Sequence, residues 1–272
     1  MKKINKFIDL HFHLDGSITV DIAKKLAELQ KIDLGEDGDE VKIKRKFSVQ
    51  DDCDSLNQFL NCFELPLKLL QTKEGITEAV RLVADNILSQ GVIYAEFRFA
   101  PQKHMDRGLT QEQVVLAAIE GTKQTKLRVN LILCLFRGDD EKNALNNYQT
   151  LELAKKYLNN GIVAIDLAGS ESDYKTEKFK DYFDKAKEYG IPFTIHAGED
   201  DGPESIKHAI EFGAKRIGHG TNAFKSESVL NLIKEKGIVL EMCPTSNVIT
   251  KTIEKIEDFP FMKYLNQGIK VT

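Results

Sequence analysis

The run Val129-Asn130-Leu131-Ile132-Leu133-Cys134-Leu135-Phe136 decides the fold class of this chain, together with the two segments after it in the sequence. An amphipathic helix pattern covers Asn143–Leu158, and a second apolar run covers Ile162–Leu167. Apolar runs of this length that do not alternate strictly with polar residues are typical of parallel strands buried on both faces. Strand, helix and strand in succession therefore predict a parallel βαβ unit.

The same alternation extends over most of the chain. Strand-like runs lie at Phe7–Leu10, Val92–Phe99, Val129–Phe136, Ile162–Leu167, Pro192–His196, Arg216–His219, Ile238–Met242 and Ile269–Val271. Helix patterns lie at Gln111–Thr125, Asn143–Leu158, Thr176–Tyr189, Pro203–Phe212 and Glu227–Lys236. Eight such units predict an α/β fold, a (β/α)8 TIM-type barrel, whose usual length is about 250 residues. An open doubly wound sheet is the alternative, although no GxGxxG sequence follows the first run.

Two further expectations concern the organisation of the barrel. The long interval between the first two runs, residues 17–90, predicts a helical insertion after strand 1. Without linkers or repeats, residues 1–272 are expected to form a single barrel domain. The last run, Ile269–Thr272, begins a strand and stops, so we expect a barrel truncated at strand 8 and C-terminally incomplete, with open edges or another segment filling the gap.

Composition excludes several classes of protein. The chain has 272 residues and a net charge of −4 from 38 basic and 42 acidic residues, which gives no reason to expect nucleic-acid binding. No run approaches the roughly 18 apolar residues of a membrane helix. Four cysteines without a CxxC pair argue against a disulfide framework or a zinc ribbon. We expect a cytoplasmic protein, and the sequence does not indicate its oligomeric state.

Four of the six histidines lie at the ends of expected strands. His11 and His13 are two residues apart and so point to one face, while His196 and His219 end the fifth and sixth strands. Catalytic groups of barrel enzymes gather at these strand ends, and imidazole is a good zinc ligand. Bound zinc lowers the pKa of its water to about 7. The pattern predicts a zinc site, and Glu199, three residues after His196, is placed for proton transfer.

The remaining candidates have simpler interpretations. For His104 and His208 we expect ordinary packing or surface roles. An apolar stripe with helical spacing in the inserted segment is more often plain helix core, but it could also form an apolar wall over a flat heteroaromatic substrate. Its members are Leu56, Phe59, Leu60 and Phe63.

Ordered motifs along nearly the whole chain resemble those of the adenosine deaminase family of metal-dependent hydrolases. They are His11-Phe12-His13-Leu14-Asp15-Gly16-Ser17, Ala95-Glu96-Phe97-Arg98-Phe99-Ala100-Pro101, Asp166-Leu167-Ala168-Gly169-Ser170-Glu171, His196-Ala197-Gly198-Glu199, Ile217-Gly218-His219-Gly220 and Glu241-Met242-Cys243-Pro244-Thr245-Ser246-Asn247. The resemblance implies one Zn2+ per chain and hydrolytic deamination of adenosine or 2′-deoxyadenosine, giving inosine or 2′-deoxyinosine and ammonia.

The resemblance also implies a role for individual residues. His11, His13 and His196 would bind zinc. Glu199 would protonate the purine ring nitrogen beside the carbon under attack, and His219 would orient the zinc-bound water. The implied substrate contacts are Asp15 to the ribose, the backbone of Gly169 to the purine, and Leu56, Phe59, Leu60 and Phe63 as an apolar gate.

One departure from the family pattern limits this expectation. Family members continue from a strand like Ile269–Thr272 into an Asn-Thr/Ser-Asp-Asp-Pro sequence, which supplies a zinc ligand and a purine contact. Those residues are not among the 272, and Asp200, in the turn after Glu199, is only a weak candidate for a substitute ligand. We therefore expect severely reduced deamination by this exact polypeptide. The alternatives are a non-catalytic binding protein and a deaminase of adenine or a modified purine.

Overall fold

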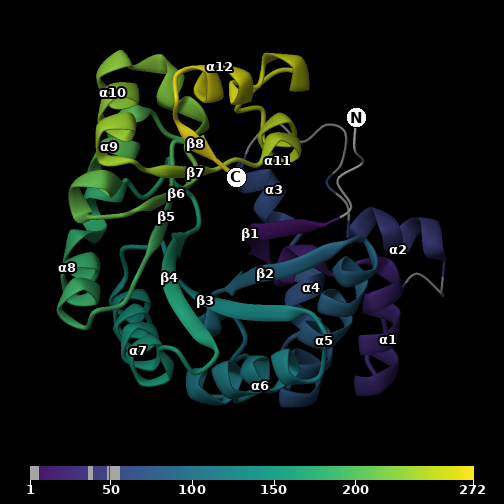
Figure 1. Ribbon diagram of the computed structural model, residues 1–272. Coiled ribbons are helices and arrows are strands. Elements are labelled where there is room, and N and C mark those ends of the chain that lie inside the picture. The colour runs from purple at the N-terminus through teal and green to yellow at the C-terminus, as the bar shows by residue number, and fades with distance from the viewer. Residues whose placement is uncertain (1–5, 36–38, 48, 50–55) are drawn as a thin grey trace. The chain divides into compact units, whose positions relative to one another are not determined.

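All eight expected strands are present, and all of the pairing recorded between them is parallel. The computed structural model describes residues 6–35, 39–47, 49 and 56–272. One sheet has the order β1-β2-β3-β4 and the other β5-β6-β7-β8 (Figure 1). Their bounds are β1 Phe7–His13, β2 Val92–Phe99, β3 Arg128–Phe136, β4 Ile162–Ala168, β5 Thr194–Ala197, β6 Arg216–His219, β7 Val239–Glu241 and β8 Lys270–Val271.

Helices separate the strands as the sequence predicts. Within the described residues, the expected insertion after the first strand contains the helices α1 Val20–Gln30, α2 Glu40–Lys46, α3 Leu56–Asn61, α4 Glu64–Leu69 and α5 Lys73–Ser89. The later helices are α6 Gln111–Lys123, α7 Glu141–Tyr157, α8 Lys180–Glu188, α9 Pro203–Phe212, α10 Glu227–Lys236, α11 Pro244–Ile249 and α12 Phe261–Asn266. The α/β class with a (β/α)8 order of elements is confirmed.

The chain divides into two compact units. The first comprises residues 1–53, 58–132 and 159–162, and the second comprises residues 54–57, 133–158 and 163–272. The boundary falls within strands β3 and β4. The expectation of a single domain therefore stays a prediction, and each unit is described by itself.

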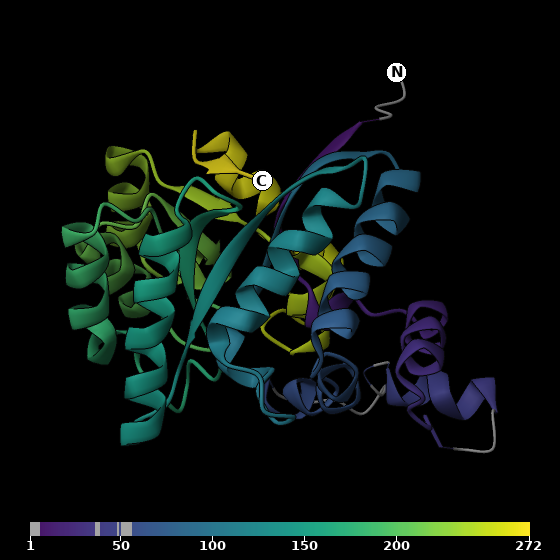
Figure 2. The same cartoon turned by 90° about the horizontal axis from the view of Figure 1, so that it is seen from below.

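In the first unit, β1 and β2 pair in parallel with partners such as Phe12 and Phe97 and, at the strand ends, His13 and Arg98. The Phe12 and Phe97 rings stack, with centroids 4.9 Å apart. Helices α5 and α6 run beside one another in the blue and teal part of Figure 2. Helices α5 and α6 bury apolar side chains, and burial of apolar surface is the dominant favourable contribution to the free energy of folding.

In the second unit, β5, β6 and β7 pair in register, with Ala197 opposite His219 and Gly218 opposite Glu241. Helices α8, α9 and α10 follow one another along one side of this sheet (Figure 1). Helix α10 begins at the Ser226 cap and ends at Gly237, whose φ of 63° is the left-handed conformation that glycine adopts readily. These short strands with tightly capped helices bring His196 and His219 to adjacent strand ends.

No helix in the described part of the chain is both long and apolar enough to cross a membrane.

His104 has the packing role expected from the sequence. Its ring is 1% exposed, meets the edge of Phe99 at 5.7 Å between centroids, and places Nδ1 3.1 Å from the carbonyl oxygen of Leu70. Because a carbonyl only accepts, Nδ1 carries the proton. Burial lowers the pKa of His104 from 6.5 to about 4; the Leu70 bond raises the pKa and the charge of Lys103 lowers it further.

The depressed pKa of His104 predicts a stability that falls in acid. Between pH 6.5 and about 4 the unfolded chain binds the proton that the native His104 refuses, so unfolding becomes easier as pH falls. His104→Asn keeps a donor near Leu70 but cannot titrate. In wild type, the free energy of unfolding should fall by up to about 3 kcal/mol over this pH range because of His104, and the variant should lack this fall. Urea unfolding at several pH values measures the difference. The matched control is His208→Asn. The assignment to His104 would be contradicted if the free energy of unfolding still fell with pH in His104→Asn but no longer fell in His208→Asn.

Candidate functional site

His196 lies at the end of β5 against a fully buried carboxylate. Its Nδ1 atom is 2.7 Å from Oδ2 of Asp166, which comes from β4 and is 0% exposed. A carboxylate at this distance favours the tautomer with the proton on Nδ1. The arrangement therefore directs Nε2 toward any metal, as carboxylate–histidine pairs do in metalloproteins.

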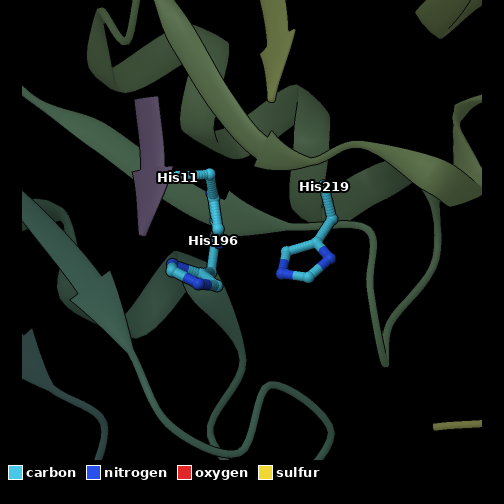
Figure 3. Close-up of side chains that lie close together, drawn as sticks. All are labelled: His11, His196 and His219. Carbon is cyan, nitrogen blue, oxygen red and sulfur yellow. The ribbon is translucent and has the colours of Figure 1, made fainter. Parts of the chain in front are cut away.

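His219 lies at the end of β6 in a strained turn. Its φ is +64°, and the N–H of Gly220 donates to the carbonyls of both Gly218 and Ala197, at 3.0 Å each. The bond to Gly218 closes a three-residue γ-turn around His219, a conformation that is rare because it is strained. Figure 3 shows the His196 and His219 side chains, whose ring centroids are 5.2 Å apart. The figure also draws His11, which belongs to the first unit.

The environment of His219 assigns its tautomer. Asn247 is fully buried, and its Oδ1 accepts the hydroxyl of Thr221 at 2.7 Å. That orientation puts the amide donor, Nδ2, 3.1 Å from Nδ1 of His219. Nδ1 also lies 3.4 Å from Oδ1 of Asn247, but its contact with Nδ2 is shorter and favours Nδ1 as the acceptor. The ring proton is then on Nε2, the atom 3.3 Å from Oε2 of Glu199.

Glu199 is a buried acid with a strongly shifted pKa. Burial raises the pKa of its carboxyl from 4.5 to about 8, the charges of Glu171 and Asp200 raise it further, and the charge of Arg137 lowers it. At neutral pH this carboxyl therefore holds a proton and can donate it. A polar cavity of about 440 Å3 opens beside it, lined by Glu199, Asp200, Asp201, Gly202, Asn222, Lys225, Thr250, Lys251 and Thr252.

The expected purine contact at Gly169 has a backbone that favours glycine. Its φ is +107°, and a side chain there would meet Cβ of Arg137 and the ring of Phe136 at 3.3 Å. The bare peptide can therefore be approached closely by a ligand.

In the first unit, the expected ligands His11 and His13 lie together on β1. Their ring centroids are 5.3 Å apart, with an angle of 57° between the planes. Beyond β1, Asp15 begins the short helix η1 (Asp15–Ser17). Burial raises the pKa of Asp15 to about 6, against the lowering effects of the backbone N–H groups of Asp15 and Gly16 and the charge of Lys103.

Phe63, one member of the apolar stripe, lies beside this segment of the first unit. A side chain on Gly16 would come within 3.2 Å of the Phe63 ring, so glycine permits that approach. Phe63 meets Phe59 edge to face at 5.7 Å between centroids. Leu60 is partly buried and Leu56 is buried. Their expected role as a gate stays a prediction.

Sequence reasoning missed the polar residues that hold this site. Asp166, Asn247 and Glu171 had appeared only as parts of motifs, with no role assigned. Arg98 in β2 is fully buried, and its Nη2 donates to the carbonyl of Leu10 at 2.6 Å. Two of these residues had a usable signal, because Asp166 and Arg98 are charged residues inside apolar strand runs.

Asn247 should set both the stability of this region and the tautomer of His219. In Asn247→Ala, two buried polar groups, on His219 and Thr221, lose their partner, at a cost of about 1–3 kcal/mol in the free energy of unfolding. The proton of His219 should also redistribute between the two ring nitrogens. Urea unfolding measures the first effect and 15N NMR of the metal-free protein measures the second. Asn266→Ala, at an exposed position of α12, is the control; an equal loss in both variants would refute the buried role.

Comparison with known proteins identifies the family. The family model described as adenosine deaminase matches residues 7–272. An adenosine deaminase from Haemophilus ducreyi is 45% identical over 97% of this chain and 78% of its own length, and one from Clostridium perfringens is 38% identical over 97% and 80%.

Solved structures agree with the assignment. An adenine deaminase from Arthrobacter aurescens matches with a TM-score of 0.85 and 25% identity, over 98% of this chain and 81% of its own. An amidohydrolase from Burkholderia ambifaria, solved with bound Zn, has a TM-score of 0.80 at 18% identity over 98% and 73%, which shows the fold alone. On the match over residues 7–272 and the identity to its relatives, this chain belongs to the adenosine deaminase family.

Proposed function

We propose that this chain catalyses the hydrolytic deamination of adenosine and 2′-deoxyadenosine, releasing ammonia and the corresponding inosine. The observation that carries the proposal is the buried Glu199 carboxyl, which lies 3.3 Å from His219 and whose burial raises its pKa to about 8, in a member of the adenosine deaminase family. The reaction needs a group that can protonate the purine ring, and few side chains are neutral acids at pH 7. The proposed compartment is the cytoplasm, as expected from the sequence.

We propose His11, His13 and His196 as the protein ligands of one zinc ion. The donor set fits the metal, because three imidazoles suffice in some catalytic zinc sites. The contact between Asp166 and Nδ1 of His196 supports the assignment, since it leaves Nε2 as the ligating atom. When bound, zinc would supply a water molecule with a pKa near 7.

The proposed work of Glu199 is to move one proton. Its protonated carboxyl donates to the purine ring nitrogen next to C6, which makes C6 more electrophilic. Water adds at C6, the C6–N bond breaks, and ammonia leaves, so adenosine and water give inosine and ammonia. His219, with its proton on Nε2 facing Glu199, is proposed to orient that water and to stabilise negative charge beside the carboxyl.

Substrate contacts are proposed for the residues expected from the sequence. Asp15 would bind the ribose hydroxyls, and the peptide of Gly169 would contact the purine. The positive φ of Gly169 supports its role, because no other residue leaves this peptide as accessible. Leu56, Phe59, Leu60 and Phe63 would form the apolar gate. Adenine remains the alternative substrate, because a structurally similar protein is an adenine deaminase.

Replacement of Glu199 tests the proposed proton transfer. Glu199→Gln keeps the size of the side chain but cannot donate a carboxyl proton, so kcat for adenosine should fall by about 10²–10⁴-fold. The measurement is the loss of adenosine absorbance at saturating substrate. Zinc content and the unfolding midpoint of the variant should stay close to the wild-type values.

The matched control is Glu204→Gln, on the exposed first turn of α9, which should keep wild-type kcat. The same assay is run with 2′-deoxyadenosine, adenine and N6-methyl-AMP. Turnover of adenine without turnover of adenosine would show that adenosine is not the substrate. Equal rates for wild type and Glu199→Gln would show that Glu199 does not transfer the proton.

Replacement of Asp166 tests the proposed metal site. Asp166→Asn loses the carboxylate that favours the proton on Nδ1 of His196, so zinc affinity should fall about 10–100-fold. Competition with a chromogenic chelator measures the affinity, with Asp184→Asn, at a half-buried position of α8, as the control. An unchanged affinity in Asp166→Asn would argue against His196 as a ligand.

A further inference from the structure

The main chain of Glu199 is held by side chains on both sides of the residue. Its N–H donates to Oε2 of Glu171 at 2.9 Å. Its carbonyl oxygen accepts from Nδ2 of Asn222 at 3.1 Å and from the hydroxyl of Thr252 at 3.0 Å. Three side chains, from segments that follow β4, β6 and α11, thus converge on one residue.

Glu171 forms the amino side of this arrangement. Its carboxylate is 1% exposed and accepts four consecutive backbone N–H groups, from Gly198 at 2.7 Å, Glu199 at 2.9 Å, Asp200 at 3.0 Å and Asp201 at 3.2 Å. It also accepts the hydroxyl of Ser205. Hydrogen bonds to an ionised acceptor are about twice as strong as neutral ones, so this carboxylate fixes the whole turn after β5.

Asn222 and Thr252 form the carbonyl side. Asn222 is 5% exposed. In addition to its bond to Glu199, its Nδ2 donates to the carbonyl of Asp201 at 2.8 Å. Its backbone N–H donates to the carbonyl of Gly198 at 2.9 Å. Thr252 follows α11 and lines the cavity beside Glu199. The turn after β5 is therefore tied to the segments after β6 and α11.

We propose that Glu171, Asn222 and Thr252 are positioning residues that hold the main chain of Glu199 so that its carboxyl reaches the substrate. This inference rests on the proposed function of Glu199. A glutamate side chain has three rotatable bonds and does not fix the position of its own carboxyl, so a defined main chain narrows the positions that the carboxyl can take. Since misplacement of a reacting group by 1 Å can cost about 100-fold in rate, a backbone held at both peptide groups gives the required precision.

A positioning role differs from a general folding role in what it changes. Loosening Glu199 leaves its chemistry intact and leaves the proposed ribose and gate contacts, which lie on other segments, in place. We therefore expect kcat to fall while KM for adenosine stays nearly constant. A folding defect would instead lower the fraction of active protein and affect unrelated threonine variants as well.

Thr252 allows the sharpest test, because valine has nearly the same shape without the hydroxyl. Thr252→Val should lower kcat about 10-fold and change KM less than twofold, while Thr252→Ser, which restores the donor, should recover most of the loss. The matched control is Thr122→Val in α6, whose hydroxyl donates to the carbonyl of Ile119, far along the chain from Glu199. Equal effects of valine and serine at position 252, or a rise in KM without a fall in kcat, would overturn the proposal.

Glu171→Gln and Asn222→Ala extend the test to the other two residues. Both should lower kcat, Glu171→Gln the more strongly, by about 100-fold. Hydrogen exchange followed by mass spectrometry on the peptide containing residues 198–201 gives a readout that needs no activity. Exchange there should quicken at least 10-fold in Glu171→Gln and stay at the wild-type rate in Thr122→Val.

The two proposals fail in different ways. If the wild-type chain, loaded with zinc, turns over no purine substrate, the proposed function fails, and the exchange experiment still tests whether Glu171 holds the turn. If the wild type is active but exchange at residues 198–201 is unchanged in Glu171→Gln, the positioning proposal fails and the function stands.

Discussion

A single buried guanidinium links several segments of the second unit through hydrogen bonds. Arg137, at the end of β3, is 2% exposed and donates to the carbonyls of Tyr174 and His196 at 2.7 Å and to the hydroxyl of Thr176 at 3.0 Å. Burial lowers the pKa of Arg137, and the charges of nearby acidic side chains raise it; they are those of Glu171, Asp166, Asp201 and Glu199. An isolated buried cation would be very costly, but here hydrogen bonds and acidic neighbours compensate for lost water.

The same cation lies close to both Glu171 and Glu199. The Glu171 carboxylate, which accepts hydrogen bonds from four peptide groups, places a negative charge beside Glu199. That negative charge, added to burial, raises the pKa of nearby Glu199 to about 8, and Arg137 limits the rise. The Glu171 carboxylate therefore has two effects: it holds the turn after β5 through hydrogen bonds, and its charge raises the pKa of Glu199 in that turn.

The strands and the histidines at their ends could be predicted because each produces a pattern within a few consecutive residues. A parallel strand buried on both faces appears as an apolar run, and a residue at its end, such as His196 or His219, can be located by counting. The supporting contacts were not predictable, because they join distant residues: Asp166 precedes His196 by 30 positions, and Asn247 follows His219 by 28. Polar loop residues such as Glu171 look like ordinary surface residues until the fold brings their partners to them.

Strain at His219 explains why its position depends on the sheet as a whole. A left-handed γ-turn at a non-glycine residue costs about 1–3 kcal/mol, so it persists only where its surroundings enforce it. Here the N–H of Gly220 is shared between the carbonyls of Gly218, within β6, and Ala197, at the end of β5. Gly220 is itself left-handed, and a side chain on it would come within 2.7 Å of Leu240 in β7. The register of β5, β6 and β7 therefore fixes the turn, and through it the imidazole that faces Glu199, so a shift of either outer strand would act on the proposed proton-transfer pair without touching either residue.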